Sequence, residues 1–500
     1  MQTITKDKFL KLKSGTDVRG VAVETSTEKI ELTDEVVEAI CTGFVRWYRD
    51  KFGKNELSIA VGHDSRISAD RIKNAAIKAF MGEGVHVYDC GLATTPSMFM
   101  SIVMGVKADA SLEITASHHP YQRNGLKFFT PNGGLEGSDV SDILNLSYDI
   151  KSAGLNGTIE KYDLMSVYAE HLRNTIIKEV ANGDKPLDGL KISVDAGNGT
   201  AGFYAYDVLE PLGANVSGSQ FTEPNGMFPN HIPNPENSVA IASACEMVKK
   251  SKSDFGLIFD TDADRMGCVD SSGREINRNR LVALASVIAL EGNPGGTVVT
   301  DSLTSDGLRE FIEKTLGGKQ IRFKRGYKNV IDKSIELNNE GVNSPLAIET
   351  SGHAALKENY FLDDGAYLAT KIVILLAKLN NDGKKIDDLI SELKEPAESV
   401  EIRIPILLDD FREYGEKVIA DLKEHFSEMC GYSYEPVNYE GVRFNIPGGW
   451  FLLRLSVHDP ILPLNIENDS VGRVKPVAAD IKEFLSGFDK LDISDFDKVF

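Results

Sequence analysis

The sequence predicts three related α/β domains with mixed sheets, followed by an α+β domain at the C-terminus. The chain has 500 residues, which is enough for several domains of about 100–200 residues each. From Ser58 onward, short apolar runs alternate with helical patterns, and this alternation restarts twice along the chain. After Pro396 the pattern changes to strand-like runs with two helices, which indicates a fourth domain of another class.

Each α/β unit has its own set of expected elements. The first has strands at residues 57–61, 85–88 and 110–114 and helices at 69–81, 96–104 and 135–149. The second has strands at 190–194 and 255–259 and a helix that begins at Ala201. The third begins near Asn277, with a helix at 281–291 and strands at 297–300 and 320–324. No short fixed-period repeat is visible, so a solenoid is excluded.

The fourth unit combines strands and helices in a different order. Its strands are expected within residues 400–406 and 441–466, and its helices at 409–425 and 474–485. The junction at 394–399 is polar and contains a proline, as is typical of a linker. The expected domain boundaries are therefore 1–165, 166–275, 276–398 and 399–500.

The composition is that of an ordinary globular protein, with 42% hydrophobic and 26% charged residues. The formal net charge of −20 argues against binding to nucleic acid or to anionic membrane surfaces. An anionic substrate would need a locally basic cleft.

The cysteines indicate a reducing compartment. There are five of them, scattered along the chain without a Cys-x-x-Cys pair, which argues against a disulfide framework or a zinc site. Residues 1–10 lack the apolar core of a signal peptide, and the longest apolar runs, such as 281–290, are too short to span a bilayer. We therefore expect a cytoplasmic protein.

A serine follows the predicted strand at 110–114, in the run Thr-Ala-Ser-His-His-Pro at 115–120. Such strand ends are where α/β sheets usually place their chemistry. Ser117 is not the nucleophile of a hydrolase elbow, because no Gly-x-Ser-x-Gly surrounds it. Taken alone, the run is best interpreted as a polar turn before a second strand that carries Lys127.

Three aspartates alternate directly after the predicted strand at 255–259. Asp260, Asp262 and Asp264 can converge on a hard cation if the backbone turns there. An EF-hand loop is excluded, because Arg265 and Ser271 stand where that loop requires Gly and Glu. A carboxylate cluster after a buried strand is costly without a cation, which favours a metal site over a solvated turn.

Two other polar patterns have both a structural and a functional interpretation. Lys127 is either a surface lysine or an acid/base group whose pKa is lowered by burial or nearby cations. Glu349 and Ser351 follow the apolar run 346–348 and can bind vicinal sugar hydroxyls as acceptor and donor. Ser351 can equally serve as the N-cap of a helix.

Together, these motifs resemble those of the α-D-phosphohexomutases, and most of all the phosphomannomutase/phosphoglucomutase branch. The serine run resembles the phosphoserine loop Thr-Ala-Ser-His-Asn-Pro, with His119 in place of Asn. The aspartates resemble the magnesium loop Asp-x-Asp-x-Asp-Arg, and residues 124–128 resemble Asn-Gly-Ile-Lys-Phe. Residues 348–353 resemble the sugar loop Gly-Glu-x-Ser-Gly-His, with Ile348 in place of the first Gly.

Weaker matches occur in family order along the rest of the chain. Residues 17–20 resemble Asp-Ile-Arg-Gly, and residues 324–327 resemble Lys-x-Gly-His with Tyr327 in place of His. The spacing of residues 357–358 and 363–367 is also similar to that of the branch. Residues 224–231 resemble another stretch of the same branch, to which we assign no catalytic role.

The resemblance implies a role for each matching residue. The implied catalytic residues are Ser117, Lys127 and Arg19. The implied substrate-binding residues are His118, Arg265, Lys324, Glu349, Ser351, His353, Arg454 and Ser456. The implied ligands of Mg²⁺ are Asp260, Asp262, Asp264 and a phosphate oxygen on Ser117. It further implies a central cleft between the four domains, closed over the substrate by the fourth.

The phosphate-binding loop of the fourth domain departs from the family pattern. Arg443, Trp450 and residues 454–456 align with it, where Arg-x-Ser-Gly-Thr or Arg-x-Ser-Asn-Thr is usual. Here the loop continues Val-His-Asp-Pro at 457–460, and Asn465 stands where an arginine is common. One hydroxyl and one cation are thus lost, which would weaken phosphate binding or alter substrate choice.

The implied function is interconversion of hexose 1-phosphate and hexose 6-phosphate, for glucose, mannose or both. Phosphorylated Ser117 would act through a hexose 1,6-bisphosphate that is both intermediate and activator. The expected partners are hexose phosphates, and the expected assembly is a monomer or small homo-oligomer. Two alternatives remain open, a phosphoglucosamine mutase and a phosphosugar-binding protein with little turnover.

Overall fold

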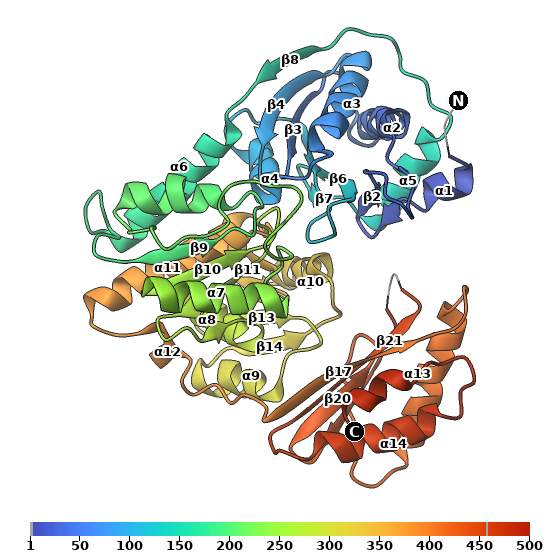
Figure 1. Ribbon diagram of the computed structural model, residues 1–500, viewed down its shortest axis with the longest axis vertical. Coiled ribbons are helices and arrows are strands. Elements are labelled where there is room, and N and C mark those ends of the chain that lie inside the picture. Colours follow the sequence, from blue (N-terminus) through green and yellow to red (C-terminus); the bar gives the residue numbers. More distant parts are fainter. Residues whose placement is uncertain (1–3, 457–458) are drawn as a thin grey trace. The chain divides into compact units, whose positions relative to one another are not determined.

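The computed structural model describes residues 4–456 and 459–500, and it divides into two compact units. The first comprises residues 1–277, 351–355 and 362–387, and the second comprises 278–350, 356–361 and 388–500. Within the described residues the strands form four sheets, three in α/β domains and one in an α+β domain (Figure 1). The predicted fold class is confirmed.

The first sheet is mixed, with the strand order β1-β2-β6-β5-β3-β4-β8 and β7 paired to β6. Its strands are β1 (Lys13–Ser14), β2 (Asp17–Val21), β3 (Ser58–His63), β4 (His86–Leu92), β5 (Ala110–Ile114), β6 (Arg123–Thr130), β7 (Gly133–Gly134) and β8 (Thr158–Lys161). Strand β3 pairs in parallel with β4 and β5, whereas β6 is antiparallel to β5 and to β2. The loop at the carboxyl end of β5 therefore returns directly into β6.

Helices cover this sheet and close its core. They are α1 (Lys6–Leu10), α2 (Asp34–Phe52), α3 (Ala69–Gly82), α4 (Thr95–Val103) and α5 (Gly137–Ser147). Apolar side chains of α2, α3 and α5 pack with those of β3, β5 and β6 in one cluster that includes Phe44 and Phe128. These two rings stack with centroids 4.2 Å apart. Burial of such rings supplies much of the stability that holds the loops at the sheet edge.

The second sheet belongs to the same unit and has the order β12-β11-β10-β9. Its strands are β9 (Ile192–Asp195), β10 (Phe255–Phe259), β11 (Met266–Asp270) and β12 (Glu275–Ile276), and its helices are α6 (Leu164–Val180) and α7 (Ser238–Ser251). The helix predicted from Ala201 is present, mostly as a π-helical segment, Tyr204–Leu209, followed by the 3₁₀ turn Glu210–Leu212. Pro211 lacks an N–H donor, so a continuous α-helix cannot form there.

Helix α11 (Gly365–Asn381) packs in the first unit although the sequence places it far from its neighbours. The Tyr168 hydroxyl of α6 donates to Asp364 over 2.7 Å, and Lys371 pairs with Glu179 over 2.7 Å. Residues 351–355 also belong to this unit, and Arg265 and His353 form an antiparallel bridge.

The second unit contains the fourth sheet and most of the third domain, of which residues 354–355 and 386–387 belong to the first unit. The third sheet has the strand order β14-β13-β15-β16. Its strands are β13 (Thr297–Thr300), β14 (Lys319–Arg322), β15 (Leu346–Ile348) and β16 (Ala354–Leu356). The helices of this domain are α8 (Asn279–Glu291), α9 (Asp306–Glu310), α10 (Tyr327–Asn339) and α12 (Ile386–Leu389). Strand β13 pairs in parallel with both β14 and β15.

The fourth sheet is antiparallel, with the order β17-β21-β20-β19-β18. Its elements are β17 (Glu398–Pro405), β18 (Ser433–Tyr434), β19 (Val442–Ile446), β20 (Gly449–Leu453), β21 (Ile461–Asn468), α13 (Arg412–Ser427) and α14 (Val474–Leu485). Both helices pack on one face of the sheet, around a core that includes Phe426 and Phe444 (Figure 1). Among the described residues, no helix combines the length and the apolarity that crossing a bilayer requires.

Candidate active site

Residues 260–264 form the tight connection between β10 and β11. These two strands are antiparallel neighbours, and Phe259 pairs with Met266 directly beside the connection. Ala263 has a positive φ of 59°, which turns the backbone sharply enough to bring alternate side chains together. Asp260, Asp262 and Asp264 are all buried, with exposures of 0%, 0% and 1%. The predicted turn after an apolar strand is thus present.

The three carboxylates have the properties of a cation site. One ligand atom from each lies within 4.8 Å of the others. Burial, followed by the charge of Asp264, raises the pKa of Asp260 well above its ordinary value and that of Asp262 to about 6. The Oδ1 atoms of Asp262 and Asp264 are buried and have no hydrogen-bond partner among the residues described. A hard divalent cation fits this donor set, because it would satisfy the free oxygens and offset the repulsion.

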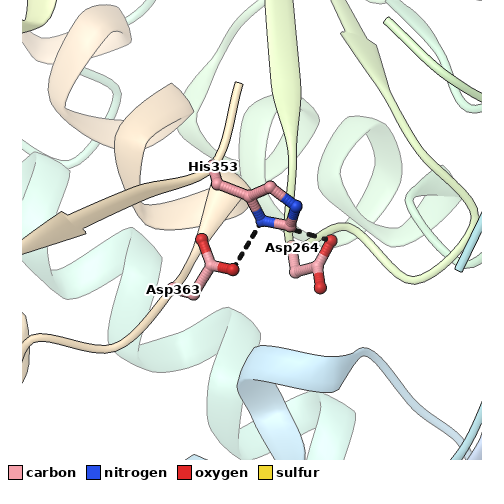
Figure 2. Close-up of side chains that lie close together, drawn as sticks. All are labelled: Asp264, His353 and Asp363. Atoms are coloured by element: carbon pink, nitrogen blue, oxygen red, sulfur yellow. Dashed lines mark hydrogen bonds and ion pairs between the residues drawn. The ribbon is translucent and has the colours of Figure 1, made fainter. Parts of the chain in front are cut away.

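Asp264 differs from the other two because cations surround it. Burial opposes its ionisation, but Lys127, His353 and Arg265 together hold the pKa of its carboxyl below the ordinary value. Lys127 Nζ donates to Asp264 Oδ2 over 3.1 Å. His353 Nδ1 lies 2.5 Å from Asp363 Oδ2 and 4.0 Å from Asp264 Oδ1. Figure 2 shows the imidazole between these two carboxylates.

Ser117 lies at this cluster, in the loop between β5 and β6. Its hydroxyl accepts from Arg265 Nη2 over 3.0 Å and donates to Asp260 Oδ2 over 3.3 Å. Arg265 Nε also donates to Asp260 Oδ2 over 3.0 Å, so the arginine links the serine to the first aspartate. Ser117 is only 7% exposed, so the turn at residues 115–120 places its hydroxyl inside the buried cluster.

His118 lies beside the serine as a neutral imidazole. Burial, and next the charge of Arg265, lowers the pKa of its ring to about 2. The ring can therefore accept from Arg265 Nη2, which lies 2.5 Å from His118 Nδ1, and Ser117 Oγ lies 3.3 Å from the same nitrogen. Arg19 of β2 lies opposite Gly125 of β6 and pairs with Asp17 over 2.9 Å.

Thr95, at the start of α4, contacts the aspartate-bearing loop at residues 260–264 (the metal loop), and it is missing from the predictions. Its hydroxyl donates to Asp262 Oδ2 over 2.5 Å, and its N–H donates to the Asp262 carbonyl over 3.0 Å. Only a threonine or serine at a helix start could have suggested it, and such residues are common caps.

Asp64 and Arg66 support the serine loop and are also missing from the predictions. They follow β3 as a buried ion pair, with Arg66 Nε 3.0 Å from Asp64 Oδ2. An acidic and a basic residue two apart after an apolar strand was the available signal. The turn that contains them has an ordinary polar composition, which gave no reason to expect that both side chains are buried.

The predicted residues of the second unit differ in burial. Glu349 is buried, and its Oε1 accepts from Gly326 N over 2.6 Å. Lys324 is exposed, and its Nζ lies 5.6 Å from the ring centroid of Phe323. Ser351 belongs to the first unit, where it is buried.

Glu440 contacts Arg454 and two neighbouring loops. Its carboxylate accepts from Ser302 Oγ over 2.8 Å and from Arg325 N over 2.7 Å, and it lies 3.7 Å from Arg454 Nε. Burial, and next the charge of Arg325, lowers the pKa of Arg454. Arg325 therefore adds a second cation near Arg454, a contribution that the sequence did not suggest.

The predicted phosphate loop is only partly described. The hydroxyl of Ser456 accepts from Asp459 N over 3.2 Å, and Ser456 N donates to the Ile461 carbonyl over 3.0 Å. Val457 and His458 lie outside the described residues. Asn465, which stands where an arginine was expected, lies within 3.4 Å of Glu401.

Three family descriptions match the chain in succession. They are phosphoglucomutase/phosphomannomutase alpha/beta/alpha domain I over residues 11–151, domain II over 166–273 and domain III over 277–396. Together they cover well over half of the chain.

Individual relatives agree with these matches. The chain is 31% identical to a phosphoglucomutase/phosphomannomutase of Thermococcus kodakarensis, over 91% of this chain and 93% of that one. It is 29% identical to a phosphomannomutase/phosphoglucomutase of Pseudomonas putida, over 85% of this chain and 87% of that one. A crystal structure of a family member from Burkholderia thailandensis has a TM-score of 0.80 and 26% identity, covering 97% of this chain and 98% of that one. The chain therefore belongs to the phosphoglucomutase/phosphomannomutase branch of the α-D-phosphohexomutase family.

Proposed function

We propose that this chain is a mutase that interconverts hexose 1-phosphate and hexose 6-phosphate, with glucose, mannose or both as the sugar. The relatives named above support this activity. The observation that carries it is the position of Ser117 Oγ, which lies 3.0 Å from Arg265 Nη2 and 3.3 Å from Asp260 in the first unit. A serine so placed among buried charges can carry a phosphoryl group.

Asp260, Asp262 and Asp264 would hold Mg²⁺, together with a phosphate oxygen on Ser117. When bound, the ion offsets the negative charge that develops during phosphoryl transfer. Arg265, which donates to Ser117 Oγ, is proposed to contact the same phosphoryl group. His118 accepts from Arg265 and would keep this guanidinium in place.

In the first half-reaction, a sugar hydroxyl attacks the phosphorus of phosphorylated Ser117. The phosphorus–oxygen bond to the serine breaks as the bond to the sugar oxygen forms. Lys127, which enters this step as a neutral amine, takes the hydroxyl proton, and the serine oxygen leaves as an alkoxide that the Arg265 guanidinium would stabilise. The product is a hexose 1,6-bisphosphate. After this intermediate has turned over, Ser117 accepts its other phosphoryl group, and the departing sugar oxygen takes the proton back from Lys127.

The remaining residues are proposed to bind the sugar and its second phosphate. Glu349 and Ser351 would orient the ring hydroxyls, while Lys324, Arg454 and Ser456 would bind the distal phosphate. Arg19 and His353 complete the proposed set on the side of the reacting phosphoryl group. We further propose a cytoplasmic location, with hexose phosphates rather than nucleic acid or membranes as partners, and a monomer or small homo-oligomer.

The test is a panel of steady-state assays with the phosphates of glucose, mannose and glucosamine, with glucose 1,6-bisphosphate and Mg²⁺ added. We expect turnover of glucose or mannose phosphate that is lost in EDTA and restored by Mg²⁺. Preferred turnover of glucosamine phosphate would identify a phosphoglucosamine mutase. Tight binding without turnover of any sugar phosphate would instead show a binding protein and overturn the proposal.

A further inference from the structure

We propose that Arg66 is a positioning residue that fixes the backbone of Ser117, and that residues 224–231 brace Arg66 from the second domain. Arg66 lies outside the groups assigned to chemistry or substrate. The inference rests on the proposed function, because it concerns how the phosphoryl-carrying serine is aimed.

Ser117 has a conformation that needs external support. Its φ of 51° lies in the left-handed region, which is uncommon for residues other than glycine and costs energy unless the surroundings enforce it. Its N–H donates to Thr115 Oγ1 over 2.8 Å, and that hydroxyl donates to Asp64 Oδ2 over 2.8 Å. Its carbonyl accepts from Arg66 Nη2. Both peptide groups of the serine are therefore held by the Asp64–Arg66 pair.

Arg66 also holds the rest of the loop through its main chain. Besides Ser117, the guanidinium donates to the carbonyls of His119 over 2.7 Å, Pro120 over 2.8 Å and Arg123 over 3.0 Å. The side chain is 0% exposed, so water cannot replace these contacts. A planar guanidinium can reach four carbonyls and a carboxylate at once, whereas the single ammonium nitrogen of a lysine cannot.

Residues 224–231 also pack against Arg66. This packing gives a structural role to a motif that was assigned no catalytic role. The ring of Phe228 lies 5.3 Å from the guanidinium carbon of Arg66. Gly226 packs on the backbone around Arg66 so closely that a Cβ there would lie 2.4 Å from Ile67 N. The segment is anchored within its own domain, since Asn225 N donates to the Asn198 carbonyl over 2.9 Å.

The expected consequence concerns the aim of the serine rather than substrate binding. A displacement of about 1 Å at a reacting atom costs roughly 100-fold in rate. Relaxation of Ser117 toward an ordinary φ would move its Oγ away from Arg265 and Asp260. Affinity for the sugar phosphate would be unchanged, because Arg66 is assigned no contact with that ligand.

The test compares Arg66→Lys with Arg71→Lys. Arg71 is a matched control in the same domain, because its guanidinium donates to the carbonyls of Ala22 and Leu32 and pairs with Asp34. The measured quantity is the rate at which glucose 1,6-bisphosphate phosphorylates Ser117, followed by intact mass. We expect Arg66→Lys to lower this rate about 100-fold, with KM for the bisphosphate unchanged and Arg71→Lys near wild type.

A second set of variants separates positioning from folding. Added guanidinium ion should restore part of the rate in Arg66→Ala, whereas equal concentrations of NaCl should not. Phe228→Leu should lower the rate less than Arg66→Lys does. An equal fall in the phosphorylation rate of Arg66→Lys and Arg71→Lys, or an increase in KM with no fall in the rate, would overturn the inference. Phosphorylation can be measured without mutase turnover, so a failed sugar panel would overturn the proposed function and leave this test valid.

Discussion

The cations proposed to act at the site differ in exposure between the two compact units. In the first, Ser117, Lys127 and the three aspartates of the metal loop are all less than 8% exposed, and side chains far apart in sequence fix one another. In the second, Lys324 is exposed, and the Arg454 side chain is 13% exposed with its Nε 3.7 Å from Glu440. Burial strengthens electrostatic effects and excludes water, which suits a site that must transfer a phosphoryl group and not hydrolyse it.

This difference in exposure predicts which kinetic step the charged residues of each unit affect. Buried charges are preorganised, so their removal should affect the chemical step. Accessible cations can bind and release a phosphate as the bisphosphate turns over, so their removal should affect binding. Variants in each unit can break or confirm this division.

The largest effect is expected from Ser117→Ala, which removes the proposed phosphoryl carrier. We expect kcat to fall by about 1,000-fold or more, and intact mass should never show the added phosphate that part of the wild type carries. Ser111→Ala is the control, because Ser111 is buried in β5 of the same sheet and outside the site. Near-normal turnover in Ser117→Ala would remove the mechanism.

The next effect concerns the metal loop of the first unit. Asp262→Asn should lower Mg²⁺ affinity by at least about 10- to 100-fold, because carboxylate charge sets the binding of a hard cation. Activity titrated with Mg²⁺ after dialysis against EDTA measures this. Asp270→Asn, at the far end of β11, should leave the Mg²⁺ midpoint unchanged. Full activity of the dialysed wild type in excess EDTA would contradict a metal site.

In the second unit, Arg454→Ala should act on binding. A charge-assisted contact to phosphate contributes about 1.5–3 kcal/mol, so KM for hexose phosphates should rise about 10- to 100-fold. Phosphorylation of Ser117 by the bisphosphate should remain measurable. Arg403→Ala is the control, since Arg403 is exposed on β17 and pairs with Glu401. A fall in kcat at unchanged KM would break the division between the two units.

The smallest effect is a pH dependence of stability in the fourth domain. Burial, opposed by Arg443, raises the pKa of Glu467 from its ordinary 4.5 to about 7. The stability contributed by this group is thus fully present below about pH 4.5 and is lost as pH rises through about 7.

Glu467→Gln removes this titration. The melting temperature of the variant should therefore rise relative to wild type, by a few degrees, between about pH 5 and about pH 8. Thermal unfolding followed by circular dichroism measures it, with kcat unaffected at either pH. A difference between the two proteins that is the same at both pH values would refute the assignment.

Local patterns predicted the elements well where burial determines them. Strands β5, β10 and β13 and helix α14 have the expected bounds, because each is a run whose apolar spacing alone specifies it. Motifs also singled out the loop at residues 260–264 and Ser117, and the roles assigned to them stay predictions. By contrast, Arg66 and Thr95 act through contacts with loops that are distant in sequence. Such contacts depend on the strand order of the sheets, which no local pattern specifies.

The support of the serine loop has a consequence for how this sequence can change. Arg66 binds carbonyl groups, which every residue carries, and does not read the side chains of residues 119–123. His119 can therefore stand where related loops have Asn while the serine keeps its direction. The direction of the Ser117 side chain therefore depends on the backbone of residues 119–123 and not on their side chains. These side chains can be substituted without moving the serine hydroxyl. A change to Arg66, to Asp64, to Thr115 or to the length of the loop would alter the backbone at Ser117.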